Sequence, residues 1–266
     1  MTQRFVKLAF IRFRLNRDPI WWKRRLLPRR RRLIRQPQAA LAFSTATTKT
    51  SSSATAVTNS IVTAAGSLLV AYCGQGANNT STVTMTDSGG VNVWSQTASG
   101  YSSANSSSRC SMNFVANAGA VTTVTSTWSG SLSTTVSMCV YEITGAATSS
   151  PEDSSVNSSN NVSEQTATSG ALTTTNANDI LLFGVRLGTS NSSWNTSSGY
   201  TSPTGSTDVR IAIEYQIVST TQSGVTVTRT WTGNATHAEV FAAFKQAPAA
   251  AAAVGTTART LTGAGM

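Results

Sequence analysis

The sequence predicts an all-β protein, an antiparallel two-sheet β-sandwich of jelly-roll type built from an internal duplication. The chain is poor in charge, with 11% Asp, Glu, Lys and Arg, and it is rich in Ser, Thr, Ala, Val and Gly. β-branched residues suit a pleated, half-buried surface, and short apolar runs alternate here with turn residues. A third observation is that one stretch of strands, residues 109–143, recurs as residues 210–245.

The repeat matches along its strands and has a two-residue insertion in the second copy. Its period of about 100 residues predicts copies over residues 60–145 and 172–247. The matched pairs are Arg109 and Arg210, Cys110 and Ile211, Met112 and Ile213, Phe114 and Tyr215, Val124 and Val227, Trp128 and Trp231, Met138 and Phe241, and Tyr141 and Phe244. We expect one shared core rather than two small sandwiches, because each copy has few large apolar residues and pooling them buries more surface.

Four parts follow one another along the chain. Residues 1–40 form a basic arm, residues 41–59 a linker, residues 60–247 the duplicated sandwich, and residues 248–266 a flexible, low-complexity tail. The tail and linker are assigned from their small and polar residues, which bury too little apolar surface to fold alone.

Within the sandwich, two strands are apolar on both faces, as expected in a core: residues 67–73 (SLLVAYC) and 179–185 (DILLFGV). The sequence DSGG at residues 87–90 predicts a hairpin turn. Residues 211–217 alternate, which predicts one face in the core and one in water. Residues 136–143 and 238–244 should be central strands, and the polar segment 146–178 a surface crossover.

The charge is concentrated in the arm. The first 40 residues carry thirteen Lys or Arg and one Asp, whereas the rest of the chain has 7 basic and 9 acidic residues. The arm is predicted to be disordered or ordered by a partner. Three functions compete for it: binding nucleic-acid phosphates, docking on an acidic protein surface, and organelle targeting.

Docking inside an assembly is favoured, because Trp and Arg are typical interface anchors and exposed aromatics are costly in water. The residues expected to anchor the arm are Arg12, Arg14, Trp21, Trp22, Lys23, Arg24, Arg25, Arg29, Arg30, Arg31 and Arg32.

No motif identifies a reaction, so we expect a protein that is not an enzyme and that holds no cofactor or metal. The three cysteines lie in apolar strand patterns and are interpreted as buried thiols rather than a disulfide or metal site. Glu142 and Glu239 are a weak candidate for a facing carboxylate pair. His237 is interpreted as a solvated histidine in a polar turn. No apolar run approaches the ~20 residues of a transmembrane helix.

Aromatic residues are the candidates for ligand contact. Exposed Trp and Tyr side chains form stacking platforms for sugar rings or bases. Trp128 and Trp231 lie an even number of residues from valines in the same strands, so they point to the same face as those valines. Core packing is therefore predicted for both. The ligand-facing candidates are Trp94, Tyr101, Trp194 and Tyr200, which lie near Ser-Gly-Tyr loops.

Several features occur together between Ser60 and Lys245: the strand SLLVAYC, the turn Asp87-Ser88-Gly89 before Trp94, the segments VTTVTSTWSG and SMCVYEITG, and the final VFAAFK. In this combination the chain resembles a β-sandwich domain found in phage tail and head-surface proteins and in large secreted bacterial proteins. The resemblance covers about 70% of the chain. It implies a structural or adhesive module without catalysis and carries over no functional residues. The arm resembles the Arg-rich arms of jelly-roll capsid proteins.

These observations predict a non-enzymatic virion structural protein, a capsid decoration, fibre or surface module present in many copies and anchored to other capsid or tail proteins by its arm. The expected location is the particle surface, with an extracellular or cell-surface location as the alternative. Two further hypotheses are a carbohydrate-binding or adhesive module that contacts a host glycan, and a jelly-roll coat protein whose arm binds packaged nucleic acid.

Overall fold

The computed structural model describes residues 39–52, 54–76, 80–105, 108–130, 135–191 and 193–249. Within these ranges the secondary structure consists of strands, and no helix occurs. The strands are β1 (Ala42–Ser51), β2 (Ala56–Ser60), β3 (Ser67–Gln75), β4 (Val83–Asp87), β5 (Ser95–Gln96), β6 (Ser102–Ala104), β7 (Ser108–Ala118), β8 (Thr123–Trp128), β9 (Val136–Thr144), β10 (Glu152–Thr168), β11 (Asp179–Leu187), β12 (Trp194–Asn195), β13 (Ile211–Val218) and β14 (Thr228–Lys245).

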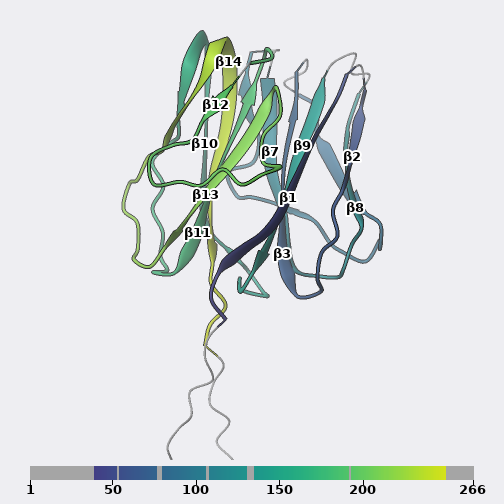
Figure 1. The fold of residues 1–266 in the computed structure, drawn as a ribbon, viewed down its shortest axis with the longest axis vertical. Helices are drawn as coiled ribbons and strands as arrows, with labels where there is room; N and C mark the ends of the chain where they lie inside the picture. The colour runs from purple at the N-terminus through teal and green to yellow at the C-terminus, as the bar shows by residue number, and fades with distance from the viewer. Residues whose placement is uncertain are drawn as a thin grey trace, which may run out of the picture. The chain divides into compact units, whose positions relative to one another are not determined.

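The strands form three antiparallel sheets. The first has the order β1-β9-β3-β7-β5 with β6 also on β7, and the second has the order β10-β14-β11-β13 with β12 on β14. A third, smaller sheet has the order β2-β8-β4. In Figure 1 the first and second sheets lie side by side, with β2 and β8 on the outer side of the first. The predicted all-β class with antiparallel sheets is therefore confirmed, in a β-sandwich-like arrangement.

The first and second sheets share a buried core. Every residue of β3 and of β11 is buried, because both faces of these strands are covered by protein. The side chains in the shared core come from alternate positions of the inner strands, as the two-residue period of a strand requires. They include Leu68, Val70, Tyr72, Met112, Tyr141, Ile143, Ile180, Leu182, Ile213, Val240 and Phe244.

Two tyrosines of the first sheet tie it to the second. The Tyr72 hydroxyl donates to the Ala238 carbonyl at 3.0 Å, and the Tyr141 hydroxyl donates to the Ile213 carbonyl at 2.9 Å. Both hydroxyls are fully buried, so these hydrogen bonds satisfy groups that would otherwise be costly to bury. The shared core therefore specifies one relative placement of the two sheets.

Each large sheet also has a core on its outer face. Leu69, Ala71 and Cys73 of β3 pack with Trp128 of the small sheet. On the other side, the alternate residues of β11 pack with Trp231. We expected one shared core in place of two small sandwiches. The described residues form a shared core between the two large sheets and also a separate core on the outer face of each. Strands with two apolar faces need to be covered on both sides. Trp128 and Trp231 are both 2% exposed, which confirms their predicted core packing.

Strands β10 and β14 bend together from the second sheet into its outer layer. Their pairing shifts register between Asn160 and Glu164 and again between Glu164 and Thr166. Gly233 in β14 has a φ of +94°, a conformation that side-chain-bearing residues rarely adopt. The bend lets one continuous strand pair with β11 at one end and with β12 at the other.

The beginning and end of the described chain lie together. The Gln246 side chain donates to the Ala39 carbonyl at 2.6 Å, and Ala247 N–H donates to the Gly145 carbonyl at 2.8 Å. Gly145 has a φ of +75°, and a Cβ there would lie 2.1 Å from the Ala40 carbonyl oxygen. In Figure 1 the start of β1 (purple) and the end of β14 (yellow) accordingly meet at the lower edge of the sheets.

Two segments that we predicted to be a linker and a crossover contain strands. The predicted linker over residues 41–59 holds β1 and most of β2, and the predicted crossover over residues 146–178 holds the 17-residue β10. Both β1 and β10 lie at sheet edges. An edge strand pairs on one side and meets water, so polar Ser and Thr residues serve there and the apolar alternation that marks inner strands is missing.

The expected division of β13 into a core face and a water face is wrong at three positions. Ala212 and Glu214 are fully buried, and Ile217 is 45% exposed. Glu214 is covered because the segment that contains Ser197 folds over this strand. The central positions predicted for residues 136–143 and 238–244 are confirmed, because β9 lies between β1 and β3, and β14 between β10 and β11.

The described part of the chain contains no helix long and apolar enough to cross a membrane. The arm over residues 1–40 lies outside the described residues except for Ala39 and Ala40, and so does the tail beyond Ala249.

Candidate functional site

Trp94 and Tyr101 line one hollow of about 290 Å³ beside β4. The Trp94 indole N–H donates to Asp87 Oδ2 at 3.2 Å, and the Tyr101 hydroxyl accepts from Val83 N–H at 2.7 Å. The guanidinium carbon of Arg109 lies 4.0 Å from the centre of the Tyr101 ring. The structure thus brings the first two candidate aromatics together and leaves both partly buried.

The turn over residues 87–90 positions Trp94, but the prediction of a hairpin there is wrong, because β4 pairs with β8 and the next strand, β5, pairs with β7 in another sheet. Asp87 Oδ1 accepts hydrogen bonds from Gly89 and Gly90 N–H, each at 3.1 Å. Gly90 has a φ of +61°, which favours glycine there. Because the other Asp87 oxygen binds Trp94, one carboxylate organises the turn and orients the indole.

Trp194 and Tyr200, the second pair of candidates, have different surroundings. Trp194 in β12 lines a hollow of about 390 Å³, and its indole N–H donates to the Asp208 carbonyl at 2.7 Å. Tyr200 is absent from this lining and packs on Phe241, with 6.4 Å between ring centres. Burial raises the pKa of Tyr200. Trp194 is therefore better placed than Tyr200 to contact a ligand.

A buried ion pair lies behind Trp194. Arg229 Nη1 of β14 is 3.5 Å from Glu214 Oε2 of β13, and both side chains are inaccessible to solvent. Burial lowers the pKa of Arg229, an effect that the charge of Glu214 opposes. Glu214 also accepts from Ser197 N–H at 2.9 Å and from the Ser197 hydroxyl. The Arg229 guanidinium carbon is 5.2 Å from the Trp194 ring centre.

Sequence patterning missed this pair. Strand alternation assigns Glu214 to the water face of its strand, and 15 residues separate it from Arg229 along the chain. Two signals were available: Arg229 alternates in step with Val227 and Trp231, which were predicted to face the core, and it has the opposite charge to Glu214.

His237 is buried, 3% exposed, between two glutamates at the bend of β10 and β14. Its Nε2 lies 2.9 Å from Glu164 Oε1, and its Nδ1 contacts Glu239 Oε1. Burial disfavours the charged ring, but the hydrogen bonds and charges of Glu239 and Glu164 outweigh it and raise the pKa of His237. The interpretation of His237 as a solvated histidine in a turn is wrong, because β14 continues through this position and pairs with β11 there.

The cluster at His237 suits a structural role better than proton transfer to a substrate. Each ring nitrogen faces a carboxylate, and the Ser158 hydroxyl donates to Glu239 Oε2 at 2.9 Å. Glu142, the other half of the proposed carboxylate pair, lies in the first sheet and accepts from Ala64 N–H at 2.7 Å. The structure therefore holds Glu142 and Glu239 in different sheets.

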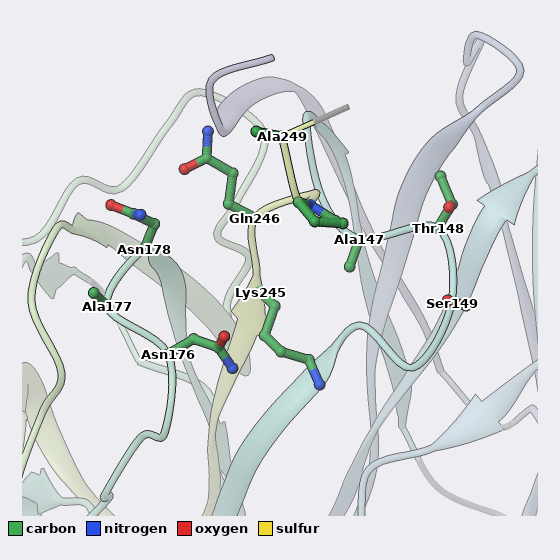
Figure 2. A pocket seen from close by; sticks show the side chains of 10 residues that line it. Ala147, Thr148, Ser149, Asn176, Ala177, Asn178, Lys245, Gln246 and Ala249 are labelled. Atoms are coloured by element: carbon green, nitrogen blue, oxygen red, sulfur yellow. The ribbon is translucent and has the colours of Figure 1, made fainter. Parts of the chain in front are cut away.

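A third hollow, of about 440 Å³, lies where the two described chain ends meet. Figure 2 shows Asn176, Ala177 and Asn178 on one side of the end of β14, and Ala147 and Thr148 on the other. Nearby, Asp179 is fully buried at the start of β11. Burial, and next the charge of Asp153, raise the pKa of Asp179 to about 7.

The three cysteines are buried and free. Burial raises the pKa of both Cys110 and Cys139 to about 12, so these thiols stay protonated near neutral pH. In the described ranges, no group of three or more His, Cys, Asp or Glu side chains is arranged to hold a metal ion. The anchoring residues predicted between Arg12 and Arg32 lie outside the described residues.

No family model, curated protein or solved structure matches this chain.

Proposed function

We propose that this protein is a non-enzymatic structural component of a virus-like particle, a surface, decoration or fibre module anchored by its basic N-terminal segment. The observation that carries the proposal is the meeting of the two described chain ends. Ala39, which directly follows the segment with thirteen basic residues, is hydrogen-bonded to Gln246. The basic segment is therefore covalently joined to the body where its two described chain ends meet.

The charge distribution of the body supports a durable surface module. The body is almost neutral, and two of its buried charged clusters are paired, Arg229 with Glu214 and His237 with two glutamates. Pairing and hydrogen bonding reduce the high cost of burying charge. The exposed edge strands β1 and β10 consist largely of Ser, Thr and Asn, which suits a surface in contact with water.

We also propose that the body arose by internal duplication. Support comes from strand order, because β1-β9-β3-β7 in the first sheet parallels β10-β14-β11-β13 in the second. Trp94 and Trp194 each donate an indole hydrogen bond to an aspartate, Asp87 by its side chain and Asp208 by its backbone. On this reading the copies extend beyond residues 60–145 and 172–247 to include β1 and β10.

The test compares the full-length chain with a variant that lacks residues 1–38, by sedimentation velocity and electron microscopy with and without nucleic acid. A second variant carries Arg29→Gln, Arg30→Gln, Arg31→Gln and Arg32→Gln and keeps the aromatic residues. We expect multi-copy assemblies of the full-length chain that are independent of nucleic acid, and a folded, non-assembling truncated body. Equal assembly by the truncated chain would refute anchoring. Closed shells that need nucleic acid would favour a coat protein instead.

A further inference from the structure

The hollow beside Trp194 is lined by residues with buried nitrogen atoms that make no hydrogen bond among the described residues. Asn191 Nδ2 is buried and makes no hydrogen bond with the described residues, although a buried amide normally finds one. Arg229 is 1% exposed, and its Nε and Nη1 likewise lack hydrogen bonds among the described residues. Both residues line the same hollow. Unpaired buried donors are costly, and they are common where a ligand completes the hydrogen bonding.

The hollow also offers a hydrogen-bond acceptor and an apolar surface. Asp208 lines the hollow, and its Oδ1 accepts from Val209 N–H at 2.6 Å, which fixes the carboxylate in place. The indole of Trp194 is held from behind by Trp231, with 5.8 Å between ring centres, and from the edge by its hydrogen bond to the Asp208 carbonyl. The wall is therefore rigid before any ligand arrives, which lowers the entropic cost of binding.

The balance of charge around the hollow disfavours an anionic ligand. The guanidinium of Arg229 is already paired with Glu214 at 3.5 Å, and Asp208 adds a second carboxylate. A ligand that suits this site has hydroxyl groups that both accept from an amide N–H group and donate to a carboxylate, together with C–H groups that pack on an indole. A volume of about 390 Å³ is within the range of small-ligand sites.

We infer that this hollow binds a neutral saccharide, one pyranose ring of a glycan. Asn191 donates to a ring hydroxyl oxygen, Asp208 accepts from a hydroxyl, and the sugar C–H groups pack on Trp194. The Arg229 side chain, which is inaccessible to solvent, stays paired with Glu214. The inference does not rest on the proposed particle role, because it concerns the second half of the body and not the arm.

The test uses the full-length protein and free sugars as probes. Galactose, glucose, mannose and N-acetylglucosamine, with glucuronate as the anionic comparison, are titrated while binding is followed by saturation-transfer NMR. The variants are Asn191→Ala, which removes one donor, and Asp208→Asn, which keeps the shape but removes the charged acceptor. Gln96→Ala, which removes an amide from the hollow of the first half, is the matched control for Asn191→Ala.

We expect at least one neutral sugar to bind more tightly than glucuronate. Asn191→Ala and Asp208→Asn should each weaken its binding about fivefold to tenfold, the effect of one lost hydrogen bond. Their urea midpoints should stay close to that of the wild type, and Gln96→Ala should leave sugar binding unchanged. The inference is overturned if none of the sugars binds, if glucuronate binds most tightly, or if the two variants bind as well as the wild type.

Discussion

The packing of Gly184 against Tyr72 makes a sharp prediction about the shared core. A Cβ added to Gly184 of β11 would lie 2.8 Å from Cγ, Cδ2 and Cε2 of the Tyr72 ring in β3. Real Cβ atoms do not come this close to ring carbons, so one of the two sheets or the ring must shift. The ring cannot swing away freely, because its hydroxyl is hydrogen-bonded to the Ala238 carbonyl.

The size of the effect follows from two opposing contributions. Overpacking a core by one methyl group costs roughly 1–3 kcal/mol, whereas replacing glycine by alanine restricts the unfolded chain and stabilises the fold by roughly 0.4–1 kcal/mol. We therefore expect Gly184→Ala to lower the free energy of unfolding by about 1–2 kcal/mol. The measurement is urea denaturation followed by circular dichroism and tryptophan fluorescence, with linear extrapolation to water.

A double-mutant cycle isolates the contact. Tyr72→Ala removes Cγ and the whole ring, so Gly184→Ala should cost nothing in that background and the coupling energy should reach about 1 kcal/mol. Gly89→Ala is the control, because its Cβ would meet no atom closer than Cγ2 of the exposed Val91, at 3.3 Å. The reasoning is refuted if Gly184→Ala is as stable as the wild type, or if its cost is the same in the Tyr72→Ala background.

Two further predictions concern pH. Asp179 has a pKa raised to about 7 in the fold, so its protonated form stabilises the protein below about pH 4 and this stability is lost as pH rises to 7. Ionising Asp179 in the fold costs at most about 4 kcal/mol, and solvent screening at the adjacent hollow reduces this cost to about half. Asp179→Asn should therefore be about 2 kcal/mol more stable than the wild type at pH 8, as measured by urea titration. Equal stability of the two proteins at pH 8 would contradict this. The pKa of His237 is also raised in the fold. The charged imidazole therefore contributes its full stabilisation below about pH 6.5, and this stabilisation is lost as pH rises through the folded-state pKa. His237→Gln should therefore lower the thermal unfolding midpoint at pH 6 more than at pH 9, and an equal loss at both pH values would exclude a charged imidazole.

The inner strands were predictable because burial on both faces leaves a local mark. β3 and β11 appear in the sequence as continuous apolar runs. Trp128 and Trp231 alternate in step with valines of their strands, which identified both tryptophans as core residues. Edge strands leave no such mark, since one side meets water, and β1 and β10 were accordingly mistaken for a linker and a crossover.

The candidate sites were only partly predictable. The Asp87 turn and the following Trp94 could be recognised from local chemistry. Tyr200 was chosen by the same reasoning as Trp194, yet it packs inward on Phe241, because spacing along a loop does not determine which aromatic faces water. Nothing local distinguished Asn191, whose amide lines the hollow beside Trp194.

The sequence by itself determined the β class, the inner strands and the concentration of charge in the first 40 residues, because composition and two-residue periodicity are properties of neighbouring positions. Only the tertiary structure decided that His237 meets Glu164, 73 residues away, and that Arg229 meets Glu214. It likewise decided that Ala39 lies against Gln246 at the opposite end of the chain. These contacts depend on how separate strands bend, pair and stack, and a one-dimensional pattern does not contain that information.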